Sequence, residues 1–111
     1  MDVLKGHLPA LVLAEVAREP GHGYALVQRL NAVSGELFGM PEGTVYPVLH
    51  KLESDGCVKA EWQESNEGRR IKIYTITAKG RRRLAGDRSR WSAMSARISV
   101  MLRFARRDVP A

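Results

Sequence analysis

Apolar residues recur at helical spacing in the first third of the chain. Positions 4, 8, 11, 12 and 16 share one helical face, and Pro9 is tolerated if the regular helix starts close to it. The run Arg-Glu-Pro-Gly at 18–21 ends this helix, because proline cannot continue the hydrogen-bond ladder. A second helix is predicted over 23–33, with a stop at Ser34-Gly35. Leu26, Val27, Leu30 and Val33 are predicted to share one face of this helix.

A third helix is predicted to begin near Thr44, which would act as its N-cap, and to close at Asp55-Gly56. Pro47 would then lie inside the first turn, where its missing N–H costs no intrahelical bond. The segment 36–43 before this helix contains glycine and proline. We interpret it as a connection whose Leu-Phe pair at 37–38 lies under the core. The apolar face of the helix is predicted to contain Val45, Val48, Leu49 and Leu52.

The period of the pattern changes after the third predicted helix. Val58, Ala60 and Trp62 alternate with polar residues, which predicts a half-buried strand with Trp62 in the core rather than in a site. A second strand is predicted over 71–76, and the polar segment 65–70 predicts a turn. The two strands are therefore expected to pair as an antiparallel hairpin with an exposed basic tip.

The last part of the chain is predicted to form one long helix. Thr77 can cap it, the helix runs to about Arg106, and 108–111 form a fraying tail. Two apolar residues per heptad indicate pairing with another helix, although Asp87 interrupts the seam. The predicted dimer interface consists of Leu84, Trp91, Met94, Ile98, Met101, Leu102 and Ala105.

The order of these elements predicts the fold class. We expect an α+β, mainly helical protein: a winged helix-turn-helix with a two-stranded wing and a long C-terminal dimerisation helix. Residues 1–76 would form the winged-helix DNA-binding domain, 77–107 the dimerisation helix of the same compact unit, and 108–111 the tail. A chain of 111 residues leaves no room for a second core.

The charge of the chain favours one class of partner. There are 18 Lys and Arg against 12 Asp and Glu, and the sequence pI is about 10.0, so polyanions such as nucleic acid or anionic lipid are favoured. Cys57 is the single cysteine, which excludes an intrachain disulfide. Neither a signal peptide nor a membrane-spanning run is found, and we expect a cytoplasmic protein with no membrane partner.

The third predicted helix has a polar face opposite its apolar one, and this face can enter the major groove. Base edges there offer acceptors for Lys51 and either kind of group for Thr44 and His50. A tyrosine at 46 could donate its hydroxyl to a phosphate. The predicted DNA-binding residues of this helix are Gly43, Thr44, Tyr46, Pro47, His50 and Lys51.

Two further segments are candidates for phosphate contacts. Arg69 and Arg70 lie at the predicted hairpin tip with Lys72 just beyond, as a wing beside the groove would place them. Gly23 and Tyr24 open the second helix, whose unpaired N–H groups suit a phosphate oxygen. An ordinary packed turn explains these last two residues equally well.

Four stretches of the sequence carry a family likeness. They are Pro-Gly-His-Gly-Tyr at 20–24, Gly-Thr-Val-Tyr-Pro-Val-Leu at 43–49, Leu-Glu at 52–53 and Tyr-Thr-Ile-Thr-Ala-Lys-Gly at 74–80. In this order they resemble the PadR family of transcriptional regulators. The resemblance implies a winged-helix DNA-binding domain, a homodimer built on the C-terminal helix, repression at a palindromic operator in double-stranded DNA, and relief by a small molecule.

The short C-terminal part resembles the small-sized branch of that family, which includes a multidrug-sensing repressor. In that repressor a tryptophan of the last helix helps form a flat aromatic site at the dimer centre, and Trp91 is at the matching place. Trp91 is explained either as a plain aromatic of the dimer core or as a plate that stacks a planar aromatic effector beside Met94. Ser95 replaces an acidic residue, which lowers the expected affinity for cationic aromatic drugs.

Two alternative functions stay open. One is a metal- or redox-responsive repressor that uses Cys57 and the histidines at 7, 22 and 50, although their spacing matches no recognised zinc pattern. The other is a winged helix that serves only as a protein-interaction module for an acidic partner. No cofactor is expected, and because no catalytic motif is found, an enzyme is not expected.

Overall fold

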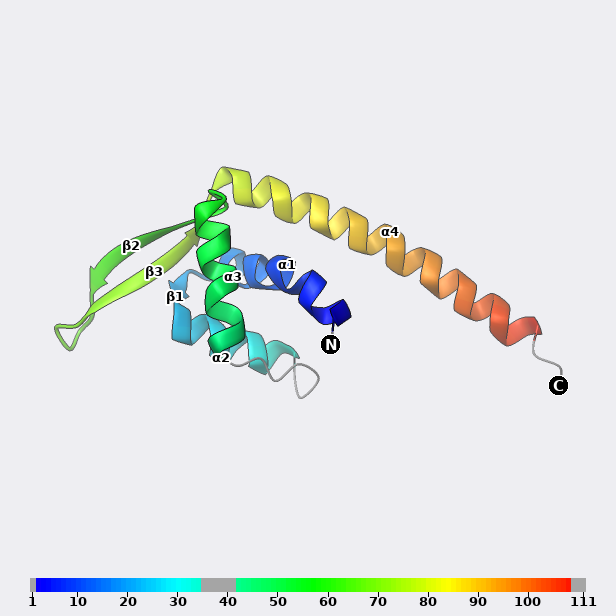
Figure 1. Ribbon diagram of the computed structural model, residues 1–111, viewed down its shortest axis with the longest axis horizontal. Coiled ribbons are helices and arrows are strands. Elements are labelled where there is room, and N and C mark those ends of the chain that lie inside the picture. Colours follow the sequence, from blue (N-terminus) through cyan, green and yellow to red (C-terminus); the bar gives the residue numbers. More distant parts are fainter. Residues whose placement is uncertain (1, 35–41, 109–111) are drawn as a thin grey trace.

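The protein is described from a computed structural model, which describes residues 2–34 and 42–108. In these ranges the chain forms an α+β winged helix with a long last helix, as the sequence predicts (Figure 1). Part of the predicted connection, including the residues at 37–38, lies outside the described residues. The elements are α1 (Asp2–Arg18), β1 (Gly21–His22), α2 (Gly23–Ser34), α3 (Glu42–Ser54), β2 (Val58–Glu64), β3 (Arg70–Ile76) and α4 (Ala78–Asp108).

Two helix starts differ from the predicted ones. Helix α1 already begins at Asp2, so Pro9 is inside it rather than near its start. Burial of Leu8 and Val12 on either side of the proline holds the helix continuous across the one hydrogen bond that Pro9 removes. Helix α3 begins at Glu42, so Thr44 is not its N-cap and Pro47 is its sixth residue. An acidic residue in the first turn suits the positive end of the helix dipole.

The sheet contains a strand that the pattern missed. Its order is β1-β3-β2, and both pairings are antiparallel. Strand β1 has two residues, which is too short to show a period, and it pairs Gly21 with Tyr74 and His22 with Ile73. This pairing attaches the start of α2 directly to the wing, which is the β2–β3 hairpin.

Trp62 is not in the core, contrary to the prediction. Opposite residues of an antiparallel pair lie on one face, and here Val58 pairs with Ile76, Ala60 with Tyr74 and Trp62 with Lys72. Val58 and Tyr74 are buried, but the Trp62 side chain is 59% exposed. The predicted alternation of faces along β2 was therefore correct. The outer part of β2, where Trp62 lies, extends beyond the helices that cover the base of the strand.

The core lies where α1, α2 and α3 meet the base of the wing. Val45, Leu49 and Leu52 of α3 are fully buried there, and full burial of such a side chain contributes about 1.5–3 kcal/mol. Helix α4 adds Leu84, of which 4% is exposed. The buried set comprises Leu8, Val12, Leu13, Val16, Leu26, Val27, Leu30, Val45, Leu49, Leu52, Cys57, Val58, Tyr74 and Leu84.

A buried carboxylate joins α1 to the turn and helix that follow. Glu15 Oε1 accepts hydrogen bonds from Arg29 Nε at 3.0 Å and from Arg18 Nη2 at 2.6 Å. Arg29 also donates to the backbone carbonyl of Glu19 at 2.6 Å. The Arg29 side chain is mostly covered and that of Arg18 mostly exposed, at 21% and 55%. Arg29 is thus the partner that compensates the buried charge of Glu15.

Helix α4 is anchored at its start and extends far past the other helices. The Thr77 hydroxyl accepts a hydrogen bond from the N–H of Gly80 at 3.0 Å, which confirms the predicted cap. A Cβ at Gly80 would lie 2.0 Å from the carbonyl oxygen of Cys57, so only glycine permits this close packing. The rest of α4 leaves the domain on the side opposite the wing, and the molecule measures 66 × 29 × 20 Å (Figure 1).

We predict that Arg29→Ala lowers the free energy of unfolding by about 2–3 kcal/mol, because it leaves the buried Glu15 carboxylate without its covered partner. Arg18→Ala, on the exposed side of the same carboxylate, is the matched control and should cost much less. Urea unfolding of the two variants measures the difference. Equal losses would mean that the buried pair is not what joins the two helices.

Candidate nucleic-acid interface

Helix α3 presents one exposed face, and the predicted DNA-binding residues are spread across it and its edge. Gly43, Pro47, His50 and Lys51 are exposed, whereas Thr44 and Tyr46 are half-buried. The exposed side chains project opposite the three buried ones, so burial of one face directs the other outward. This geometry is compatible with a helix that enters a groove.

Tyr46 serves as a packing residue as well as a surface residue. A Cβ at Gly23 would lie 2.1 Å from Tyr46 Cε1, so the ring lies directly on the glycine at the start of α2. Burial, and next the charge of Glu42, raise the pKa of Tyr46 above its ordinary value. A tyrosine hydroxyl is already protonated at neutral pH, and this rise in its pKa favours the protonated form further, so the group can donate a hydrogen bond.

The start of α2 already has a cap from its own side chains. His22 Nδ1 accepts a hydrogen bond from the N–H of Ala25 at 3.2 Å, which satisfies one of the free donors of this helix end. The rings of His22 and Tyr24 are nearly parallel, with centroids 6.5 Å apart. Gly23 is buried, whereas Tyr24 is exposed and accepts a hydrogen bond from the Gln28 amide. Of the two predicted residues, Tyr24 is the one that offers a surface.

Two of the predicted cations have acidic partners within the chain. Lys51 Nζ lies 3.1 Å from Asp55 and Lys72 Nζ lies 3.3 Å from Glu53, at the end of α3. Partial burial acts to lower the pKa of Lys72, but the hydrogen bond to Glu53 and the nearby Tyr74 outweigh it, so the pKa is raised. Lys72 thus fastens the wing to α3. The Lys51 pair is on the surface, where such pairs contribute about 0–1 kcal/mol and exchange easily for a phosphate.

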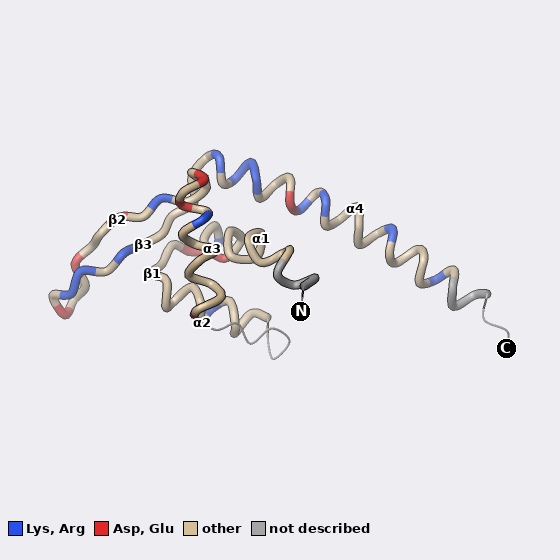
Figure 2. Tube along the Cα trace, in the orientation of Figure 1, with Lys and Arg blue, Asp and Glu red and all other residues tan. Residues whose placement is uncertain are grey.

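The wing ends in a tight turn with two arginines. Gly68 has φ +78°, and the Ser65 hydroxyl accepts hydrogen bonds from the N–H groups of Glu67 and Arg69. Arg69 and Arg70 are exposed, and within the described ranges neither guanidinium has a hydrogen-bond or ion-pair partner. Figure 2 shows that Lys and Arg gather at the outer end of the wing and along α4.

Comparison with known proteins decides the family. A family model described as the transcriptional regulator PadR-like family matches residues 12–86, which is well over half of the chain. The chain belongs to the PadR-like family of transcriptional regulators. It is 38% identical over 77 residues to the transcriptional regulator Rv3488 of Mycobacterium tuberculosis, a match that covers 69% of this chain and 68% of that protein.

Solved PadR-like structures have the same fold as this PadR-like regulator. A PadR-like transcriptional regulator from Bacillus cereus superposes with a TM-score of 0.82 at 27% identity, over 92% of this chain and 97% of that one. A PadR family regulator from Eggerthella lenta gives 0.78 at 31% identity, over 91% and 86%. The family is one of transcriptional regulators and not a class of enzyme.

The regulator also has a hollow between α1 and the middle of α4. It has a volume of about 610 Å³, and Trp91 and Met94 of α4 line it together with His7 of α1. The His7 ring meets the Trp91 ring edge-on, with centroids 5.3 Å apart. Trp91 is 55% exposed, and Ser95 is half-buried outside the lining. The predicted effector residues thus lie far along α4 from the wing.

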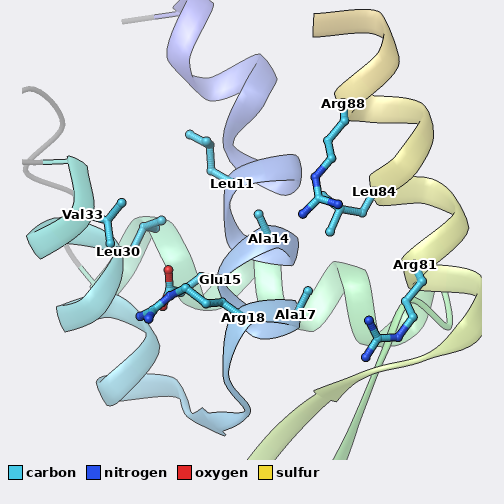
Figure 3. Close-up of a pocket in the computed structure, with 10 residues that line it drawn as sticks. All are labelled: Leu11, Ala14, Glu15, Ala17, Arg18, Leu30, Val33, Arg81, Leu84 and Arg88. Carbon is cyan, nitrogen blue, oxygen red and sulfur yellow. The ribbon is translucent and has the colours of Figure 1, made fainter. Parts of the chain in front are cut away.

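A second hollow of about 520 Å³ adjoins the first along α1 and is lined by residues of α1, α2 and α4 (Figure 3). Arg81 and Arg88 of α4 extend over its apolar floor, as Figure 3 shows. Both hollows share Leu11 and Ala14 of α1, which are only partly buried within the described part of the chain.

The described residues contain no preformed metal site, and their one thiol is buried. Among residues 2–34 and 42–108, no three His, Cys, Asp or Glu side chains lie close enough to share a metal ion. Cys57 is buried beside Arg83, whose Nη1 lies 3.8 Å from Sγ. In the same ranges every helix is too short or too polar to cross a membrane.

Proposed function

We propose that the protein is a homodimeric repressor that reads a palindromic operator with α3 and contacts the flanking backbone with the wing. The observation that carries this proposal is the exposed face of α3, held outward by a fully buried opposite face. A net charge of +6 and membership of a family of transcriptional regulators support it.

Each element has a separate part in recognition. His50 and Lys51 are long enough to reach base edges in the major groove, where hydrogen-bond patterns distinguish all four base pairs. Thr44, Tyr46 and Tyr24 lie at the margin of this face and suit phosphate contacts that set the register. Arg69 and Arg70 of the wing supply charge without base specificity.

The free half of α4 supports a homodimer. Its apolar side chains are exposed in the single chain, and Met101 is 68% exposed. An exposed apolar stripe of this length marks an interaction surface. A second α4 can cover it, and the partly exposed Leu11 and Ala14 of α1 extend the same surface. The exposed stripe contains Trp91, Met94, Ile98, Met101 and Leu102, whereas the exposed Val100 and Phe104 lie on another side of the helix.

Two predicted interface residues differ from the rest. Leu84 is already buried within the chain, so it supports the interface from beneath. Ala105 is in α4, but its side chain lies outside the described residues. A two-fold dimer would place the two α3 helices in successive major grooves, with half-site centres about 34 Å or roughly 10 base pairs apart.

The hollow beside Trp91 supports a planar aromatic effector. Trp91 and Met94 offer a stacking surface and an adaptable apolar wall, and a second copy would double this surface at the two-fold axis. Such a ligand releases DNA only if it binds better to a dimer geometry with the wrong half-site spacing. Binding at α4 would alter that spacing, because α4 connects the two winged helices.

We predict that His50→Ala or Lys51→Ala weakens binding to a duplex that the protein itself selects from a random-sequence pool. Removing a side chain that bonds to a base edge should cost about 1–3 kcal/mol. Ser54→Ala, at the exposed end of α3, is the control. Fluorescence anisotropy compares selected with random duplex. If the variants discriminate between the two duplexes as well as the parent does, α3 is not the reading helix. A parent that binds neither duplex would favour the protein-interaction module.

We predict that Met101→Asp converts the dimer to a monomer, because the pairing would bury an unpaired carboxylate. The dissociation constant of the dimer should rise roughly hundredfold. Ser92→Asp adds the same charge to an exposed polar position of the same helix and should leave the dimer intact. Sedimentation equilibrium measures both variants. A strictly monomeric parent would exclude the proposed mode of operator binding.

We predict that acridone, a neutral planar aromatic, quenches the emission of Trp91 and releases the selected duplex. The measurement uses Trp62→Phe, because Trp62 is exposed and its emission would mask that of Trp91. Met94→Ala in the same background should weaken the quenching. Cadmium and zinc are titrated in parallel. A response to a metal ion and none to acridone would favour the metal-responsive alternative.

A further inference from the structure

Trp62 lies on the wing, and its exposed indole is not part of the hydrophobic core. It lies on the same sheet face as Tyr74, since Ala60 pairs with Tyr74 and Trp62 with Lys72. Lys72 on this face pairs with Glu53 of α3. The face that carries Trp62 is therefore the face that turns toward α3. This face continues outward along the wing, past the last contact between the wing and α3.

Arg70 lies over this indole. Its guanidinium carbon is 5.1 Å from the centre of the Trp62 ring, within the range of a cation–π contact. Arg70 is the diagonal neighbour of Trp62 across the hairpin, while Glu64 is directly opposite Arg70. Even so, the ion pairs of the described residues include none between Glu64 and Arg70. The guanidinium lies over the indole, and within the described residues its N–H donors have no partner.

An arginine held over an aromatic ring differs from an ordinary flexible arginine. The ring shields one side of the guanidinium, and the five N–H donors in the plane of the group match the oxygens of a phosphate. Because the contact with Trp62 restricts the side chain before binding, less conformational entropy is lost when the donors engage. Arg69 lies next to it at the turn, and no cation–π contact is found for it in the described part of the chain.

We propose that Trp62 is a positioning residue for DNA binding: its indole holds Arg70 in the orientation that binds a backbone phosphate beside the groove occupied by α3. This role rests on the proposed operator binding. It adds Trp62, which would act on DNA through Arg70. The occupant is a phosphate of duplex DNA, because within the described residues the guanidinium donors of Arg69 and Arg70 have no acidic partner, even though Glu64 and Glu67 lie at the same end of the wing.

The experiment measures binding of the selected duplex as a function of salt, in the whole chain, for Trp62→Ala, Trp62→Phe, Arg70→Ala and the double variant Trp62→Ala/Arg70→Ala. Arg70→Ala should reduce the slope of log affinity against log salt by about 1.8 for the dimer, which corresponds to one phosphate at each of the two half-sites. Trp62→Ala should lower affinity about two- to fivefold, because the guanidinium no longer has an aromatic ring beneath it. Trp62→Phe should keep most of the parent's affinity, because it keeps a ring under the guanidinium.

The double variant decides whether the two residues act together. If Trp62 acts through Arg70, adding Trp62→Ala to Arg70→Ala causes no further loss of affinity. An equal loss in both backgrounds, or no loss in either, would overturn the proposal. Arg69→Ala is the matched control, since Trp62→Ala should keep its full effect in that background. Unfolding midpoints confirm that the exposed substitutions leave the fold intact.

Failure of this inference differs from failure of the proposed function. A parent that selects and binds a duplex, with no coupling between the two residues, refutes only the role of Trp62. A parent that binds no duplex refutes both. In Trp91→Phe, where Trp62 is the single tryptophan, duplex addition should change the emission of Trp62, and an unchanged spectrum would place this face of the wing away from DNA.

Discussion

Burial of one face of α3 against the other helices is the interaction on which the rest of the structure depends. Val45, Leu49 and Leu52 are fully covered, which fixes the rotation of the helix about its axis. His50 and Lys51 then have to face solvent. The same packing brings Tyr46 onto Gly23. The start of α2 is therefore in close contact with α3, the helix that would read DNA.

The wing is attached to the same two helices, α2 and α3. Strand β1 attaches the start of α2 to β3, and Lys72 attaches β3 to the end of α3 through Glu53. Beyond these contacts nothing in the described part of the chain covers the hairpin, and the residues there are free to meet a partner. Trp62 and Arg70 occupy that uncovered part and contact each other. An apolar ring that is exposed and already paired with a cation is well suited to an anionic partner.

Helix α4 divides into two parts with different surroundings. Its first turns pack on the domain, where Thr77 caps the helix, Gly80 allows close approach and Leu84 is buried. Its second part carries exposed apolar side chains such as Met101, far from the core. The proposed dimer accounts for this division, because the second part acquires a core only when another copy is present. The hollow beside Trp91 lies on α4, the helix that would set the spacing between the two α3 helices of the proposed dimer.

The sequence by itself determined the order of the helices and of the two wing strands, the polar and apolar faces of α3, the Thr77 cap and the family. Periodicity and capping are local properties, so they are readable from neighbouring residues. Tertiary structure decided the start of α3 at Glu42, the strand β1 and the exposure of Trp62. Each of these depends on contacts between distant segments: alternation shows which residues share a face of a strand, but only the position of the covering helix decides how far along the strand that face is buried.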